Sequence, residues 1–341
     1  MKKVRATQGE QQTVEKTLHA PITDAVPIVT PSLQQRMQGL VKELRPRQWT
    51  KNFALFIALV FAQQLFNLPS LERTMVAWLI FCLAASSIYL LNDLLDLQQD
   101  RQHPFKRLRP LASGLVPISW ARATIVVLLL CCALLVYALF AMPIAPLPDI
   151  YAPLGGTNVL FTLTLVTYLL LMTLYSLKLK HVVLIDVFVI AAGFVLRILA
   201  GAVVVPVVIS PWLYLVTCFL SLFLALGKRR HELVLLQGQA NQHRQILQEY
   251  SLPLLDQLMT VVVTGTIIAY SLYTIEGSTG DHRLAITIPF VIYGMFRYLY
   301  LIYVRMEGGS PEEILLRDRH VLVTVLLCII LVSIILYALP A

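Results

Sequence analysis

Four oxygen-bearing side chains, Asn92, Asp93, Asp96 and Asp100, lie within nine residues directly after a long apolar run. In a helix, residues three, four and seven positions apart share one face, so the three carboxylates would lie together with the amide at the edge of that face. Carboxylates this close repel one another, and burial at a membrane boundary adds to the cost, so we expect a cation among them. Hard oxygen ligands on one short face are typical of Mg²⁺, which keeps coordination positions for water and phosphate oxygens. The spacing therefore predicts a Mg²⁺ site.

A basic segment follows these carboxylates, with four strong cations between Arg101 and Arg109. Arginine binds phosphate through two parallel hydrogen bonds, and lysine acts as a point charge. We therefore predict that Lys106, Arg107 and Arg109 bind substrate phosphates, and that the acidic and basic segments together bind a Mg²⁺-bound diphosphate. The alternative is a solvated loop whose cations only fix the orientation of the chain in a membrane.

The elements that position these residues are predicted from composition. The chain has 341 residues, of which 58% are hydrophobic and 13% are charged, and its mean hydropathy is +0.75. Soluble domains of this size are less apolar, and apolar segments near 20 residues recur, which indicates a polytopic all-α membrane protein. The runs lack the alternation of a β-barrel. Nine spans are predicted, at about 53–68, 75–92, 118–142, 158–177, 183–203, 211–227, 256–275, 284–304 and 320–339.

Most Lys and Arg residues fall on the N-terminal side of this nine-span arrangement. The positive-inside rule then places the N-terminus in the cytoplasm and the C-terminus outside. The loops that carry the candidate chemistry would all be cytoplasmic. Residues 1–40 are polar and lack the apolar segment of a signal peptide, so we expect a disordered cytoplasmic tail followed by a catalytic membrane domain over 41–341.

The sequence gives little support for nucleic-acid binding, for a zinc site or for disulfide bonds. The basic residues are scattered among loops without a recognisable nucleic-acid-binding motif, so no nucleic-acid partner is expected. The five cysteines lie inside apolar runs without a Cys-x-x-Cys pair, which indicates packing rather than zinc or disulfides.

Two charged residues lie deeper in the predicted spans. Asp186 stands among aliphatic residues where a span begins, a costly position unless the carboxylate is paired or functional. A structural ion pair with Lys178 or Lys180 and a catalytic role both remain open. Arg197 lies eleven residues further on, on nearly the same helical face and about 16 Å deeper. Its anionic partner could be a structural carboxylate or a lipid phosphate.

Further polar residues mark the ends of spans. Arg45, Gln48 and Lys51 precede the first apolar run, where they form either an interfacial anchor with Trp49 or the rim of the site. Three consecutive cations at 228–230 follow the sixth span and are either orientation signals or phosphate ligands. The polar segment of about 25 residues after them has the length of a lid or a substrate-facing cap.

Together these residues resemble the UbiA superfamily of intramembrane prenyltransferases. The pattern Asn-Asp-x-x-Asp-x-x-x-Asp at 92–100 carries this resemblance, which covers about residues 40–339. Within the superfamily, the chain is most similar to the branch of bacterial decaprenyl-phosphate phosphoribosyltransferases. The segments that carry this closer similarity are 45–52, 103–114, 175–180, 193–197, 227–229 and 311–319.

The resemblance implies an all-α bundle of nine transmembrane helices around a central cavity open to the cytoplasm, in a bacterial plasma membrane. It implies a Mg²⁺-dependent transfer of 5-phosphoribose from phosphoribosyl pyrophosphate to a polyprenyl phosphate, for cell-envelope precursor synthesis. Catalytic roles are implied for Asp93, Asp96 and Asp186. Substrate binding is implied for Arg45, Gln48, Lys51, Lys106, Arg107, Arg109, Tyr175, Lys178, Arg197, Lys228 and Arg229.

The sequence departs from the superfamily at its second acidic motif. Asp186 occupies the last position of an Asp-x-x-x-Asp pattern, and Val182 occupies the earlier one. This departure favours the phosphoribosyl branch over enzymes that grip an isoprenyl diphosphate between two acidic motifs. The alternative is a UbiA-type enzyme that moves a prenyl group from its diphosphate to an aromatic acceptor. A transporter of a phosphorylated metabolite is a third possibility, but the spans show no repeated halves.

Overall fold

The computed structural model describes residues 31–338 apart from 145–150, 209, 237–244, 277–281, 310–313 and 315–316. Every regular element in these described residues is helical. The long helices are α4 (Leu68–Leu95), α6 (Ile118–Ala141), α7 (Gly156–Leu177), α8 (Ile185–Val204), α9 (Pro211–Leu236), α10 (Leu252–Glu276), α11 (Ile288–Tyr303) and α13 (Arg319–Ser333). The short elements are α2 (Leu33–Glu43), α3 (Leu55–Phe61), α5 (Leu97–Gln102), the 3₁₀ turns η1 (Pro46–Ala54), η2 (Lys106–Leu108), η3 (Ala152–Leu154), η4 (Leu179–His181), η5 (Gln245–Glu249) and η6 (His282–Thr287), and the π-helical turn η7 (Ile334–Ala338).

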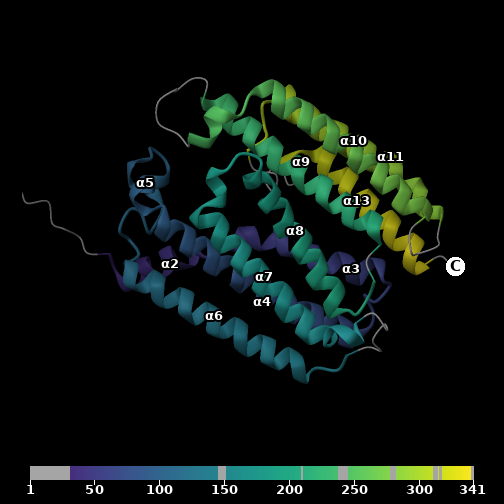
Figure 1. Cartoon of the computed structure of the whole chain (residues 1–341), viewed down its shortest axis with the longest axis horizontal. Coiled ribbons are helices and arrows are strands. Elements are labelled where there is room, and N and C mark those ends of the chain that lie inside the picture. The colour runs from purple at the N-terminus through teal and green to yellow at the C-terminus, as the bar shows by residue number, and fades with distance from the viewer. Residues whose placement is uncertain are drawn as a thin grey trace, which may run out of the picture.

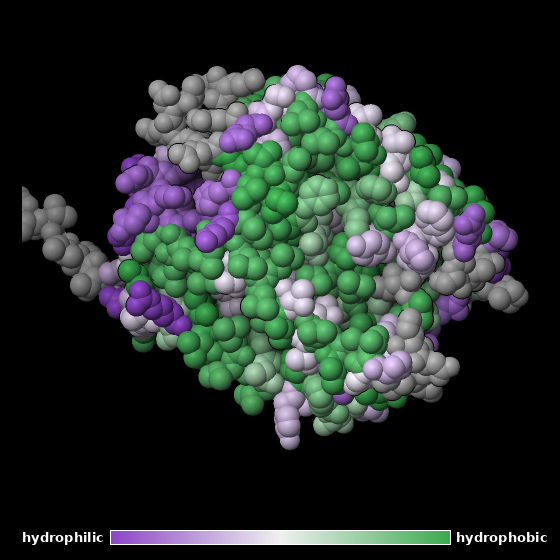
Figure 2. All heavy atoms as spheres, viewed as in Figure 1, coloured by the Kyte–Doolittle hydropathy of each residue, from purple (hydrophilic) through white to green (hydrophobic). Residues whose placement is uncertain are grey.

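Eight helical segments in the described residues are long and apolar enough to cross a membrane. They correspond to the second to ninth predicted spans, so the prediction of a multi-pass all-α membrane protein is confirmed. Figure 1 shows α4, α6 and α7 on one side of α8, and α9, α10, α11 and α13 on the other. Figure 2 shows apolar residues over the helices, with hydrophilic residues gathered at the end of the bundle near α5. On the face in view, the body of the bundle is apolar and the largest hydrophilic area lies at the end near α5, which we call the polar end.

The first predicted span differs from the other eight because it is divided between η1 and α3. Its path nevertheless leads from one end of the bundle to the other. Arg45, directly before η1, contacts Asp93 at the end of α4, whereas the carbonyl of Val60 accepts a hydrogen bond from the Tyr337 hydroxyl near the C-terminus. A ninth crossing stays a prediction, and this path favours it.

Close packing brings this first segment against α8. A Cβ atom at Gly201 would lie 2.1 Å from the carbonyl oxygen of Leu55, so only glycine lets the two backbones approach. Leu55 and Leu59 belong to one buried apolar cluster with residues of α4, α7 and α8. A second cluster joins α8 to α9, α10 and α11. Helix α8 therefore packs against both halves of the bundle.

The N-terminal segment is helical earlier than the sequence suggested. Helix α2 begins after Ser32, whose hydroxyl accepts from the Gln35 backbone N–H, while the Gln35 side chain accepts from the Ser32 N–H. The predicted boundary of the disordered tail at residue 40 therefore falls inside a helix. Residues 1–30 of that predicted tail lie outside the described residues.

Arg73 falls between the first two predicted spans, but in the structure it is buried near the start of α4, with 1% of its surface exposed. Its guanidinium donates to the carbonyls of Leu139 and Met142 at the end of α6, to that of Val204 at the end of α8, and to the side chain of Asn158. The C-terminal ends of helices carry partial negative charge. Arg73 therefore fastens two helix ends together, and those ends compensate its charge.

Candidate active site

The chain breaks its helix within the acidic motif. Helix α4 ends at Leu95, Asp96 leaves the helical conformation (φ −88°, ψ 4°), and α5 begins at Leu97. The single helical face that the spacing predicts is therefore interrupted. The four predicted metal ligands separate into two neighbouring groups, one around Asp93 and Asp100 and one around Asp96 and Asn92.

Asp93 and Asp100 meet at the same guanidinium. Arg109 Nη1 lies 2.9 Å from Asp93 Oδ1 and 2.6 Å from Asp100 Oδ2. Arg45 Nη2 donates to both oxygens of Asp93 at 2.7 Å, and Lys106 Nζ lies 3.9 Å from Asp100 Oδ1. Both carboxylates are buried, whereas Arg45 and Arg109 are about 30% exposed. Residues of the acidic and basic segments therefore lie together in one cluster, and their binding of a Mg²⁺-bound diphosphate stays a prediction.

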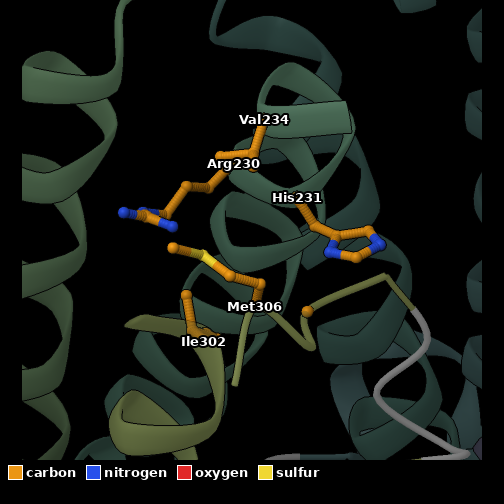
Figure 3. A pocket seen from close by; sticks show the side chains of 6 residues that line it. Arg230, His231, Val234, Ile302 and Met306 are labelled. Atoms are coloured by element: carbon orange, nitrogen blue, oxygen red, sulfur yellow. The ribbon is translucent and has the colours of Figure 1, made fainter. Parts of the chain in front are cut away.

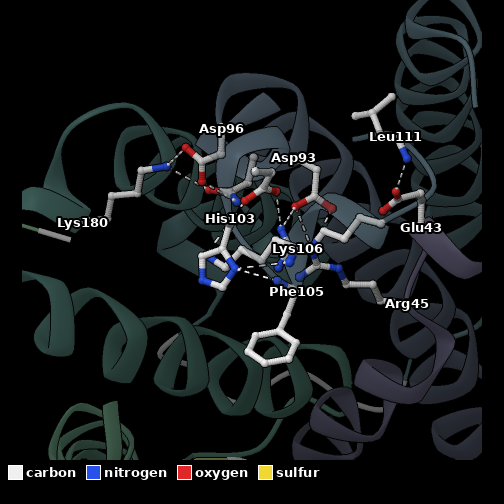
Figure 4. A network of polar contacts seen from close by, with 12 residues as sticks. Glu43, Arg45, Asp93, Asp96, His103, Phe105, Lys106, Leu111 and Lys180 are labelled. Carbon is white, nitrogen blue, oxygen red and sulfur yellow. Dashed lines mark hydrogen bonds and ion pairs between the residues drawn. The ribbon is translucent and has the colours of Figure 1, made fainter. Parts of the chain in front are cut away.

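Asp96 pairs with a different cation, Lys180. Asn92 Nδ2 donates to Asp96 Oδ2 at 3.1 Å, and Lys180 Nζ lies 2.5 Å from Asp96 Oδ1 and 3.2 Å from Asn92 Oδ1. Figure 4 shows the carboxylates of Asp93 and Asp96 facing Arg45 and Lys180, respectively. Lys180 is almost fully buried. It comes from η4, between α7 and α8, so this pair joins two cytoplasmic loops of the sequence prediction.

The oxygen donors of both groups suit Mg²⁺ chemically. Carboxylate and amide oxygens are the hard ligands that Mg²⁺ prefers, and one or two protein carboxylates suffice when substrate phosphates complete the coordination. Each carboxylate already faces a cation, which is the charge environment that a metal would supply. Among the described residues, no three acidic, histidine or cysteine side chains converge on one point. The site therefore fits a metal that arrives with a diphosphate better than a metal held by protein ligands alone.

Two side chains that the sequence analysis missed hold the basic loop in place. His103 Nδ1 accepts hydrogen bonds from the backbone N–H groups of Phe105 and Lys106, both at 3.2 Å, and so orders the turn η2. The buried Glu43 of α2 accepts from the Leu111 N–H at 2.7 Å (Figure 4). The His103 contacts order the turn within the loop that carries Lys106 and Arg109, and the Glu43 contact joins α2 to the end of that loop.

Glu43 makes stability sensitive to pH. Burial raises its pKa, the Leu111 N–H lowers it, and nearby Asp93 raises it again, to a value of about 7. The folded state therefore holds a proton that the unfolded state releases between about pH 5 and 7, so the free energy of unfolding should fall as pH rises through this window. We expect Glu43→Gln, which stays neutral, to flatten the dependence of melting temperature on pH between 5 and 8.

The matched control for this pH dependence is Glu72→Gln, an exposed residue of α4. Its melting curves should keep the wild-type dependence on pH. An unchanged pH dependence in Glu43→Gln would show that Glu43 does not carry the effect.

Asp186 has a different partner from those considered in the sequence. It is fully buried and pairs with Arg229, whose Nε lies 2.5 Å from Asp186 Oδ2, and not with Lys178 or Lys180. Arg229 is also buried, contacts Glu232, and donates to the Tyr175 hydroxyl at 3.3 Å. Lys228, the first of the three consecutive cations at 228–230, is exposed, as is Lys178.

Tyr250 completes this buried group. Its hydroxyl donates to Asp186 Oδ1 at 2.6 Å and accepts from the Leu184 N–H at 2.8 Å. Burial and the bond to Asp186 hold the pKa of Tyr250 above its usual value, so the hydroxyl keeps its proton. Tyr250 belongs to the polar segment that was predicted to be a lid or cap, of which residues 237–244 lie outside the described part of the chain. Its described end packs onto the α8–α9 region.

The remaining predicted site residues lie on η1, η2 and α8. Gln48 and Lys51 are half-buried on η1, and Arg107 is exposed on η2. Arg197 is buried within α8. In the part of the chain that the structure describes, the Arg197 guanidinium donates only to neutral groups, so it has no structural carboxylate as a partner there.

A small pocket between the ends of α9 and α11 does not belong to the acidic cluster (Figure 3). Arg230 pairs there with Asp256 at 2.7 Å and lies over the ring of Tyr303. His231 packs tightly against Gly309, where a Cβ atom would lie 2.7 Å from the imidazole. We assign these contacts to packing. The lining residues are Arg230, His231, Val234, Ile302, Met306 and Gly308.

Comparisons with known proteins bear on this arrangement. Residues 53–307 match the model of the UbiA prenyltransferase family. The chain is 31% identical over 309 residues to the decaprenyl-phosphate phosphoribosyltransferase of Corynebacterium glutamicum, covering 89% of this chain and 88% of that protein. It is 32% identical over 304 residues to the enzyme of the same name from Mycobacterium tuberculosis, covering 86% and 92%.

A solved structure shares the fold. The UbiA homolog from Archaeoglobus fulgidus bound to DMAPP and Mg²⁺ superposes with a TM-score of 0.63 at 17% identity, covering 88% of this chain and 99% of that one. At this identity the similarity extends to the fold alone.

Proposed function

The chain belongs to the UbiA prenyltransferase family, and we propose that it transfers 5-phosphoribose from phosphoribosyl pyrophosphate to a polyprenyl phosphate of the decaprenyl type, releasing pyrophosphate. The observation that carries this proposal is the similarity to two decaprenyl-phosphate phosphoribosyltransferases over almost the full length of both chains. The cluster at the polar end supports it, because acidic and basic side chains lie within hydrogen-bonding distance there.

The donor would enter where carboxylates and cations meet. Asp93 and Asp96, with Asn92 and Asp100, would hold Mg²⁺, which when bound would neutralise the charge that develops on the departing pyrophosphate. Arg45, Arg109 and Lys180 now compensate those carboxylates and would then be free to donate to phosphate oxygens. This exchange of partners explains why the same residues can pair with one another here and still bind substrate.

The chemical step needs no strong general base. An oxygen of the lipid phosphate would attack C1 of the ribose and form the new C–O bond. The bond between C1 and the pyrophosphate oxygen would break, and its electron pair would leave with pyrophosphate. A phosphate monoester is already anionic near neutral pH, so the attacking oxygen carries no proton that must be removed first. The protein would mainly orient the two substrates and stabilise negative charge.

For Asp186 the geometry favours a positioning role. The resemblance implies a catalytic role for Asp186, but its carboxylate is fully buried and contacts Arg229 and Tyr250. We propose that Asp186 holds Arg229 in place, and that Arg229 together with Tyr175 faces the donor.

We further propose that the polar end lies in the cytoplasm of a bacterial cell, with the N-terminus on the same side and the C-terminus outside. Hydrophilic residues gather at this end (Figure 2), and cytoplasmic ends of membrane proteins carry an excess of Lys and Arg. A soluble phosphoribosyl donor would meet the site from that side. The product would serve synthesis of cell-envelope lipids and glycans.

Neutralising the basic loop should weaken donor binding. Lys106 is partly exposed beside Asp100, and a charge-assisted hydrogen bond contributes about 1.5–3 kcal/mol. We therefore expect Lys106→Gln to raise the KM for phosphoribosyl pyrophosphate by roughly 10- to 100-fold, with little change in the KM for the lipid. Arg101→Gln, an exposed cation before the loop, is the matched control and should leave both constants near wild type. A change confined to the lipid KM would assign Lys106 to the other substrate.

Ligand-dependent stability tests the identity of the donor. Phosphoribosyl pyrophosphate should protect the purified protein against heat when Mg²⁺ is present and lose most of this effect with EDTA. At a concentration 100 times its dissociation constant, a ligand adds about 2.7 kcal/mol to the free energy of unfolding. Protection by geranylgeranyl diphosphate, with none by phosphoribosyl pyrophosphate, would favour a prenyltransferase with an aromatic acceptor instead.

A further inference from the structure

Arg197 is a buried cation without a compensating anion. It lies in the middle of α8 with 6% of its surface exposed. Its Nε donates to Asn52 Oδ1 at 2.7 Å, Nη1 to the Gly193 carbonyl at 2.9 Å, and Nη2 to the Tyr168 hydroxyl at 2.9 Å. All three acceptors are neutral, and none of the described acidic side chains pairs with it. A charge in a low-dielectric interior is costly unless it is paired.

Another deeply buried arginine, Arg73, shows how this fold compensates such a charge. Arg73 also has only neutral partners, but three of them are carbonyls at the C-terminal ends of α6 and α8. Those helix ends carry partial negative charge that favours a cation. Arg197 lacks this compensation, because Gly193 lies inside α8 and not at its end. Of the two arginines, Arg197 is therefore the one that needs an external anion.

The surroundings of Arg197 offer a hydrogen-bond donor to an anionic ligand. Gly193 leaves room for Met172 beside the guanidinium, since a Cβ atom at Gly193 would lie 2.9 Å from Met172 Cε and 3.5 Å from Arg197 Nη1. The Tyr168 hydroxyl accepts from Arg197 and donates to no described residue, so its proton is available. The ring of Tyr168 and that of Phe194 lie 4.9 and 5.3 Å from the guanidinium carbon and restrict it from two sides. An anion here would meet one fixed cation and one hydroxyl donor.

Tyr89 connects this position to the acidic cluster. The guanidinium of Arg45, which binds Asp93, lies 5.1 Å from the centre of the Tyr89 ring. Arg197 lies against the ring of Tyr168 in the same way, and α4, which carries Tyr89, packs against α7, which carries Tyr168. The two cations therefore each contact a tyrosine, and the two tyrosines come from neighbouring helices.

We infer that Arg197 and Tyr168, with Asn52 orienting the guanidinium, form a binding site for a phosphate monoester, and that its occupant is the phosphate of the lipid acceptor. This inference rests on the proposed function. Both substrates carry a phosphate monoester, since the donor has one at C5 of ribose. The position inside α8, beside Phe194 and Met172, favours the lipid, because a sugar phosphate would bring a polar ribose into apolar surroundings. The donor meets its cations at the polar end.

Separate Michaelis constants for the two substrates test this assignment. We expect Arg197→Gln to raise the KM for polyprenyl phosphate by roughly 10- to 100-fold, the loss of a charge-assisted contact, and to leave the KM for phosphoribosyl pyrophosphate within about twofold. Arg197→Lys, which keeps the charge but not the fork of donors, should fall between Arg197→Gln and wild type. Arg73→Gln is the matched control, because it removes an equally buried arginine. It should lower the melting temperature without a selective change in either KM.

A variant with a smaller structural effect keeps the test decisive if Arg197→Gln does not fold. Tyr168→Phe removes only the hydroxyl and retains the ring, and it should also raise the lipid KM selectively. The inference is overturned if either variant raises the donor KM instead, or if both behave like Arg73→Gln. Heat protection by polyprenyl phosphate alone gives an independent result: it should occur in the wild type and disappear in Tyr168→Phe. Wild-type protein that binds polyprenyl phosphate but forms no product would contradict the proposed function and leave the binding site supported.

Discussion

Asp93→Asn and Asp96→Asn should each reduce kcat by at least about 100- to 1,000-fold, the scale observed when a group that stabilises charge in the transition state is removed. Both carboxylates lie at the polar end within reach of the cations that would bind phosphate. Asparagine keeps the size of each side chain but removes the charge that would hold Mg²⁺. The partly exposed Arg45 and Arg109 stay solvated when Asp93 loses its charge, so we expect Asp93→Asn to fold. Asp96→Asn leaves the buried Lys180 without its carboxylate, so this variant should also lower the melting temperature.

Asp256→Asn is the matched control for these two variants. Asp256 also pairs with an arginine at 2.7 Å, but its partner Arg230 belongs to the pocket outside the acidic cluster. Initial rates over a titration of Mg²⁺ should show near-normal turnover for Asp256→Asn and almost none for the other two at any concentration. Full turnover of Asp93→Asn at saturating Mg²⁺ would remove Asp93 from the active site.

The second large effect concerns stability. Breaking a buried ion pair by removing one partner leaves an uncompensated charge and costs about 3–5 kcal/mol. Arg229→Met should approach this cost, because Asp186 would keep only the Tyr250 hydroxyl. Asp186→Asn should cost less, because Arg229 still contacts Glu232. The double variant should be more stable than the sum of the single changes predicts, since neither charge remains.

Chemical unfolding in detergent measures this double-mutant cycle. Additive effects would show that the pair contributes nothing as a pair. A separate outcome bears on mechanism: if Asp186→Asn abolished turnover without lowering stability, Asp186 would have the direct catalytic role that the sequence suggested, and not the positioning role proposed here.

Much of the fold follows from the sequence because apolar length is a strong signal in a membrane protein. Eight of nine predicted spans appear as long helices in the described residues. The exception begins with η1, where polar residues from Pro46 to Asn52 precede the apolar run and the chain forms a 3₁₀ turn before α3. Hydropathy finds the segment but does not specify this backbone conformation.

The contacts between site residues were harder to predict, because the residues that pair come from distant parts of the chain. Sequence spacing placed Asp93, Asp96 and Asp100 on one face, and the break at Asp96 divides them. Lys180 was considered as a partner of Asp186, but it pairs with Asp96 from 84 residues away. Glu43 gave no motif signal at all, since its importance depends on burial against Leu111.

The fate of the ribose tests the proposed function most directly. Purified protein would be incubated with Mg²⁺, polyprenyl phosphate and phosphoribosyl pyrophosphate labelled in the ribose, and the lipid phase would then be extracted. We predict that label enters the lipid phase in equal amount to the pyrophosphate released, and only when polyprenyl phosphate is present. Pyrophosphate release without labelled lipid, or transfer of a prenyl group from geranylgeranyl diphosphate with no transfer of ribose, would contradict the proposed function.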